Sequence, residues 1–207
     1  APLSSTVRFH CMRWCHFGVF LALCTSVALC ANSLRYFPPL SHSKKAESDA
    51  FIEEWYSAQL RALKEPALCC SNVAPARVYR FTWLRTFHNP VAIALEENSA
   101  DSWTLRTKVA DGAGGYGPGK LVVNDSRDLS VEKVAPLRKL LEPGSQFWRL
   151  PTVDESDGGF DGSQWIVEVR VGAHYHYVDR WTPEKGMVRE LGLMFMKLSG
   201  KTFGEVY

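Results

Sequence analysis

The densest group of side chains capable of acid–base chemistry lies late in the sequence. His174, His176, Asp179 and Arg180 span seven residues. An imidazole beside a carboxylate can act as a general acid or base, and a guanidinium can hold an anionic substrate. This group raises one catalytic hypothesis, a hydrolase or transferase, with Glu168 as a further carboxylate.

The element that carries this group is predicted to be a β-hairpin. Apolar and polar residues alternate over residues 165–171, which is typical of a half-buried strand, and a return strand is predicted over residues 174–181. The two residues between the strands begin with Gly172, as a type II′ turn prefers. Such a short turn fixes the register of the two strands.

This register divides the candidate residues between the two faces of the sheet. Val171 is expected to face His174, and Val169 to face His176, so both histidines share a face with valines. This environment suits core histidines or histidines that line a pocket. The other face is polar, and it fits either the wall of a ligand site or a solvated sheet face. The candidate ligand-binding residues on both faces are His174, His176, Asp179, Arg180, Glu168 and Tyr177.

A second motif resembles a phosphate site but is incomplete. Gly114, Gly119 and Lys120 have the spacing of a phosphate-binding P-loop, but Leu121 stands where that motif has serine or threonine. A strand is predicted to follow, in place of the helix whose N-terminus holds the phosphate. We therefore expect a glycine-rich turn between strands, and neither a nucleotide nor another cofactor.

A third motif resembles a calcium site. Residues 157–168 nearly match an EF-hand loop, but Gly159 occupies the third ligand position and no helices are predicted on either side. We therefore expect an ordinary acidic, glycine-rich turn with no metal. Asp157, Asp161 and Glu168 are kept only as metal candidates.

The charge balance narrows the range of partners. The chain has 24 basic and 22 acidic residues, and two of the basic residues, Arg8 and Arg13, precede an apolar segment. Removing these two (24 − 2) leaves 22 basic residues against 22 acidic ones, so the remainder is neutral. Nucleic acids and anionic lipid surfaces attract proteins with a basic excess. Both are therefore disfavoured as partners of the domain.

The apolar segment is the strongest single feature of the sequence. Residues 14–34 contain no Lys, Arg, Asp or Glu. A membrane-spanning helix needs about 20 mostly apolar residues, whereas the core of a signal peptide needs roughly 7–15. Residues 1–34 are therefore predicted to be a signal peptide or a membrane anchor, and the protein to be membrane-anchored or exported. A cytosolic protein that begins with a hydrophobic helix remains the alternative.

The cysteines do not predict a disulfide framework. Four of the six lie in or before the apolar segment, which leaves only Cys69 and Cys70 in the domain. Adjacent cysteines rarely pair with each other because the resulting ring is strained. They also lack the Cys-x-x-Cys spacing of a redox or zinc site.

Helical and extended patterns follow the apolar segment. Residues 35–47 are rich in proline, serine and lysine and predict a tether, and residues 48–207 predict one domain. Apolar residues at helical spacing predict a first helix over residues 51–63, which Pro66 ends, and a last helix that begins at Thr182 and Pro183. A short helix is also expected within residues 130–142, with Ser130 as its cap.

Alternating residues predict the remaining strands. Besides the C-terminal hairpin, these cover residues 79–87, 91–95, 103–109 and 121–123. The predicted fold is a single α+β domain, with a mainly antiparallel sheet of five or six strands and two or three helices that cover one face of it.

Several short segments resemble a set of uncharacterised bacterial membrane-anchored or exported proteins. They are residues 79–81 (YRF), 86–90 (TFHNP), 114–120 (GGYGPGK), 147–148 (FW), 161–166 (DGSQWI) and 177–183 (YVDRWTP). The resemblance covers about residues 77–200 and implies a bacterial source. It brings no activity and no functional residues.

Two functional hypotheses follow. The leading one is a non-enzymatic module of the bacterial envelope, tethered by its N-terminus, that binds a small molecule or a protein partner. Tryptophan-rich strands and glycine-rich loops can build a recognition surface, because aromatic residues are enriched at interfaces. The alternative is the hydrolase or transferase described above. A flat aromatic patch would favour binding, whereas polar side chains converging on a concave pocket would favour the enzyme.

Overall fold

The computed structural model describes residues 35–69, 77–154 and 159–207. These ranges contain three α-helices, α1 (Ala46–Ala62), α2 (Val131–Leu141) and α3 (Met187–Ser199), and the short 3-10 helix η1 (Gln146–Arg149). They also contain six strands, β1 (Arg77–Arg85), β2 (Val91–Ser99), β3 (Ser102–Ala110), β4 (Leu121–Ser130), β5 (Ser163–Val171) and β6 (His174–Trp181).

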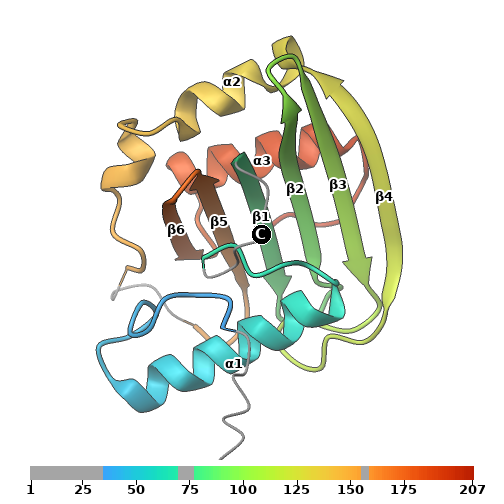
Figure 1. The fold of residues 1–207 in the computed structure, drawn as a ribbon. Helices are drawn as coiled ribbons and strands as arrows, with labels where there is room; N and C mark the ends of the chain where they lie inside the picture. The colour runs from blue at the N-terminus through green and yellow to red at the C-terminus, as the bar shows by residue number, and fades with distance from the viewer. Residues whose placement is uncertain (1–34, 70–76, 155–158) are drawn as a thin grey trace, which may run out of the picture. The chain divides into compact units, whose positions relative to one another are not determined.

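The strands form one sheet in the order β4-β3-β2-β1-β5-β6, and every neighbouring pair is antiparallel (Figure 1). The predicted antiparallel α+β fold is therefore confirmed. The hairpin register is also confirmed, because Val171 pairs with His174 and Val169 with His176. Gly172 has a φ of 60°, which the first position of a type II′ turn requires.

Helices cover both faces of the sheet, so the prediction that they cover one face was wrong. Figure 1 shows α1 in front of the sheet and α3 behind it. On the α3 side, Tyr79, Phe81 and Trp83 of β1 join the larger core with side chains of α2 and α3. On the α1 side, Tyr56 and Leu60 of the helix pack with residues of β1, β5 and β6.

The polar alternation of β1 explains why the sequence suggested an open face. Arg80 and Thr82 alternate with aromatic residues, as on a solvated strand, yet both are fully buried under α1. Buried polar groups need partners, and Glu65 and Pro66 in the chain that follows α1 supply them to Arg80. Alternation of polar and apolar residues by itself does not distinguish a solvent-exposed strand face from one that is buried with polar partners.

Two element boundaries differ from the prediction. The last helix begins at Met187 and not at Pro183, because Thr182 accepts a hydrogen bond from the backbone N–H of Ser163 and so belongs to the end of the hairpin. The side chain of Phe51 on α1 is 72% exposed. The strand predicted over residues 121–123 extends to Ser130, as β4.

Residues 35–45, which make up most of the tether predicted over residues 35–47, contribute buried side chains to the α1 side of the domain. Tyr36, Phe37 and His42 are all nearly inaccessible to solvent. The carboxylate of Asp49 accepts the backbone N–H of His42 at 2.9 Å and that of Leu40 at 3.0 Å. Burial raises the pKa of Asp49, but hydrogen bonds from backbone N–H groups, these two among them, contribute to a net lowering of the pKa.

Residues 1–34, predicted to be a signal peptide or membrane anchor, lie outside the described residues. In the three described ranges, no helix combines the length and the apolar character needed to cross a membrane. Cys69 is bonded in a disulfide, which the sequence did not predict.

Candidate functional site

The predicted acid–base group does not come together at one place. His174 is exposed beside the hairpin turn, whereas His176 is half-buried on the α2 side of the sheet. The His176 ring stacks on Trp148 at 5.8 Å between centroids and meets Phe147 edge-on at 5.4 Å. Burial lowers the pKa of His176, which keeps its ring neutral.

Asp179 and Arg180 are engaged within the fold. The Asp179 carboxylate lies on the opposite face from His176 and accepts the hydroxyl of Tyr56 at 2.7 Å. Arg180 donates to the backbone carbonyls of Pro151 at 2.9 Å and of Asp179 at 2.6 Å. Its guanidinium therefore holds the chain that follows η1 and is not presented to a substrate.

Glu168 belongs to a buried charge network below α1. Its two carboxylate oxygens accept the Nε and Nη2 groups of Arg80 at 2.7 and 2.8 Å, and both side chains are fully buried. Arg80 also contacts Glu65 at 3.2 Å, and Glu65 contacts Lys108 at 2.8 Å. Tyr175 completes the network by donating its hydroxyl to Glu168 at 3.1 Å.

Tyr177 is part of a second buried chain that sequence reasoning missed. Its hydroxyl donates to Ser41 Oγ at 2.8 Å and lies 3.0 Å from His42 Nδ1. His42 Nε2 lies 3.3 Å from Glu53 Oε2. The hydroxyl, imidazole and carboxylate follow one another as in a proton relay. The His42 side chain, however, has no exposed surface. The chain therefore fastens residues 35–45 to the sheet. The only sequence signal for it was a histidine in a segment interpreted as a tether.

The metal candidates do not form a site. Asp157 lies outside the described residues, Asp161 is exposed, and the carboxylate of Glu168 is held by Arg80. Among the described residues, no group of three or more His, Cys, Asp or Glu side chains is arranged to hold a metal ion.

The glycine-rich loop between β3 and β4 is not a phosphate cradle. The backbone N–H of Gly114 donates to His88 and that of Gly115 to Thr86, so neither is free for an anion. The loop is instead clamped by α1. Trp55 Nε1 donates to the Gly114 carbonyl at 2.7 Å, and Gln59 Nε2 donates to the same carbonyl at 3.1 Å.

This loop, the end of the hairpin and α1 together form a hollow that we name the aromatic cleft. It has a volume of about 250 Å³. Four aromatic side chains contribute to its lining, which consists of Trp55, Leu84, Thr86, Gly115, Tyr116, Gly159, Phe160, Gln164 and Trp181.

The aromatic side chains around the cleft are unusually open to solvent. Phe160 is 98% exposed and Tyr116 is 64% exposed. Phe87 is 59% exposed and lies 6.1 Å from Tyr116 between ring centroids. On α1, Phe51 precedes Trp55 by one helical turn, which places the two on the same side of the helix. These rings extend the cleft into a larger apolar surface.

Glycines allow the backbone to approach closely around the cleft. A Cβ added at Gly114 would lie 2.7 Å from the backbone of Leu84, and one at Gly162 would lie 2.6 Å from the ring of Trp181. Only glycine lets the β3–β4 loop lie flat on the end of β1 and lets the loop before β5 lie on the indole. The rims of the cleft are therefore held by backbone packing.

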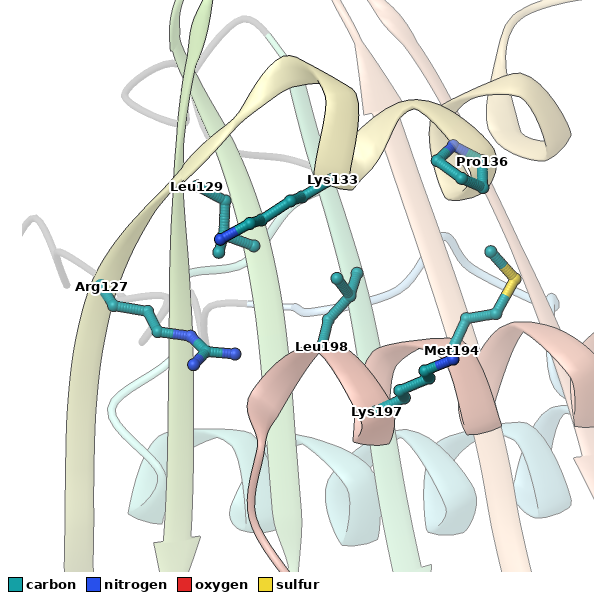
Figure 2. Close-up of a pocket in the computed structure, with 7 residues that line it drawn as sticks. All are labelled: Arg127, Leu129, Lys133, Pro136, Met194, Lys197 and Leu198. Atoms are coloured by element: carbon teal, nitrogen blue, oxygen red, sulfur yellow. The ribbon is translucent and has the colours of Figure 1, made fainter.

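A second hollow, which we name the basic groove, lies on the opposite side of the sheet between β4, α2 and α3 (Figure 2). It has a volume of about 400 Å³. It combines three cationic with four apolar side chains, namely Arg127, Lys133 and Lys197 with Leu129, Pro136, Met194 and Leu198. None of the candidate residues selected from the sequence lies in it.

Comparisons with known proteins add no further evidence. No protein-family model matches the chain, and no curated protein is detectably similar to it.

Proposed function

We propose that the protein is a non-enzymatic module of the bacterial envelope, membrane-anchored or exported, which binds a protein partner through the aromatic cleft. The observation that carries this proposal is the set of exposed rings around the cleft, above all Phe160, Tyr116 and Phe87. Solvent-exposed apolar surfaces of this kind mark interaction sites in soluble domains. Aromatic anchors supply most of the binding energy at protein interfaces.

The size of the cleft favours a protein partner over a small molecule. Sites for drug-sized ligands have volumes of roughly 300–1,000 Å³. At about 250 Å³, the aromatic cleft suits one anchoring side chain of a partner, with the exposed rings packing around it. Gln164 offers a polar group at its wall, as orienting groups do in interfaces, whereas the hydroxyl of Thr86 is engaged by the backbone of Gly162.

The construction of the cleft supports binding without large rearrangement. The β3–β4 loop is fixed by two side chains of α1, Trp55 and Gln59. A surface that is already ordered loses less conformational entropy when the partner binds. The glycine contacts with β1 and with Trp181 have the same effect.

Two features support a location in the envelope. The sequence of residues 14–34 lacks charged side chains over a length that suits a membrane anchor or an export signal. Cys69 is disulfide-bonded, and disulfides persist mainly in oxidising compartments such as the bacterial periplasm. The hydrolase or transferase alternative gains no such support, since His176 and Asp179 lie on opposite faces of the sheet.

The proposal is tested by photo-cross-linking in cells that produce the full chain. A photoreactive amino acid is placed at Tyr116 or Phe160, and at Val122 and Leu193 as controls. The two controls are exposed apolar residues outside the cleft, 58% and 42% exposed. We expect one discrete protein adduct shared by the two cleft positions and absent from both controls. Equal adduct patterns at all four positions, or none at the cleft, would refute the proposal.

A further inference from the structure

The basic groove has the size and lining of a small-molecule site, and it is independent of the aromatic cleft. Its volume of about 400 Å³ falls within the range of roughly 300–1,000 Å³ that ligand sites occupy. Three secondary-structure elements contribute to it: Arg127 and Leu129 from β4, Lys133 and Pro136 from α2, and Met194, Lys197 and Leu198 from α3.

The floor of the groove is apolar. Leu129 is buried, and Met194 and Leu198 of α3 are half-buried with their exposed parts in the groove. Figure 2 shows Leu198 between the side chains of Arg127 and Lys133 on one side and Met194 on the other. An aliphatic chain lying on these three residues would remove apolar surface from water, which stabilises binding by roughly 25 cal/mol per Å².

The rim of the groove is cationic. Within the described part of the chain, the charged groups of Arg127, Lys133 and Lys197 form neither a hydrogen bond nor an ion pair. The nearby carboxylate of Asp125 on β4 is held by Lys201 at 2.8 Å. Asp125 also attracts Arg127 electrostatically, but among the described residues no carboxylate forms an ion pair with the three rim cations.

Helix stabilisation explains two of these cations but not the third. Lys197 lies in the last turn of α3, and the guanidinium of Arg127 lies beside Gly200 at the end of that helix. Cations are favourable there because the C-terminal end of a helix carries partial negative charge. Lys133 lies in the first turn of α2, where the same dipole disfavours a cation. A residue that opposes its local structural preference points to a role in binding.

We propose that the basic groove binds a single-chain anionic amphiphile, a fatty carboxylate. Arg127 and Lys133 hold the carboxylate, and Leu129, Leu198 and Met194 hold the acyl chain. The surface of a membrane is a less suitable occupant, because residues 35–207 carry 22 basic and 22 acidic residues. That balance provides no broad attraction to anionic lipid headgroups, so the positive charge acts only locally.

Titration calorimetry of the full chain with laurate, below its micelle-forming concentration, tests this proposal. We expect one laurate per chain and much weaker binding of methyl laurate, which has the same chain without the charge. Arg127→Met and Lys133→Met should each weaken binding by roughly fivefold, because a partly exposed ion pair contributes up to about 1 kcal/mol. Lys139→Met is the matched control on α2, exposed and outside the groove, and should bind laurate as the wild type does.

Three results would overturn the proposal. The first is an absence of saturable laurate binding. The second is equal binding by the wild type, Arg127→Met and Lys133→Met. The third is binding to phosphatidylglycerol vesicles that is at least as tight as binding to free laurate and is weakened by the same substitutions, which would assign the groove to a lipid surface. Urea unfolding of each variant confirms that these exposed substitutions leave the fold intact.

Discussion

Replacement of Arg80 by methionine is the sharpest perturbation of the buried charge network. The wild-type guanidinium makes two hydrogen bonds to Glu168, one to Glu65 and one to the carbonyl of Pro66. Glu65 keeps Lys108 as a partner in the variant, but Glu168 keeps only the hydroxyl of Tyr175. The substitution thus leaves a carboxylate with no exposed surface and no cation beside it.

Breaking a buried ion pair in this way costs roughly 3–5 kcal/mol of unfolding free energy. That is a large fraction of the 5–15 kcal/mol or so by which typical domains are stable. The loss is measured by urea unfolding followed by tryptophan fluorescence. The matched control is Arg61→Met on α1, whose partner Glu54 is 68% exposed, and an exposed pair contributes about 1 kcal/mol at most.

Two further measurements distinguish the buried charge from a packing effect. The double variant Arg80→Met with Glu168→Met removes both charges and should recover much of the stability, since an apolar pair of similar volume needs no partner. Burial already raises the pKa of Glu168, so the single variant should also regain stability as the pH falls and this carboxylate takes up a proton. The reasoning is refuted if Arg80→Met costs no more than Arg61→Met, or if the double variant is no more stable than the single one.

Three other substitutions test separate parts of the structure. Burial lowers the pKa of His176, so stability is complete above the unfolded value of about 6.5 and falls as the pH decreases. His176→Phe should flatten the dependence of the urea midpoint on pH between pH 7.5 and 5.5, whereas His174→Gln, at an exposed position, should retain the wild-type slope. Gly114→Ala places a Cβ 2.7 Å from the backbone of β1 and should cost about 1–3 kcal/mol in urea unfolding, while Gly117→Ala, with open space around it, should cost far less. Tyr56→Phe removes a 2.7 Å hydrogen bond to a buried carboxylate of β6 and should lower the unfolding free energy by roughly 1.5–3 kcal/mol, and an unchanged urea midpoint would contradict that bond.

Some features of the fold could be predicted from the sequence because they depend on local interactions. The β5–β6 register followed from one two-residue turn with glycine first, and every pair predicted from it occurs. Ser130 was correctly placed before the first residue of α2, although its side chain makes no capping hydrogen bond. These features depend on residues within a few positions of each other, where turn and helix preferences decide the structure.

Features that depend on contacts between distant segments of the chain could not be predicted from the sequence. Arg80 and Glu168 are 88 residues apart, and their pairing makes a polar strand face suitable for burial under α1. His42 lies in a segment whose composition suggests a tether. In the structure it contacts the hydroxyl of Tyr177, 135 residues away, and is buried in the domain. Both hollows likewise bring together residues from several elements, so spacing along the chain gives no sign of either.

The central claim, that the aromatic cleft and not the histidine group carries the function, is tested most directly by one comparison of cross-linking yields. The photoreactive residue is kept at Tyr116, and the adduct is quantified in the otherwise wild-type chain, in Phe160→Ser and in His174→Gln. Phe160 and His174 are both exposed, so neither substitution disturbs the core. We predict that the adduct is strongly reduced by Phe160→Ser and unchanged by His174→Gln. An adduct that is unchanged in Phe160→Ser but lost in His174→Gln would contradict the claim. It would indicate that the histidine group of the hairpin carries the function.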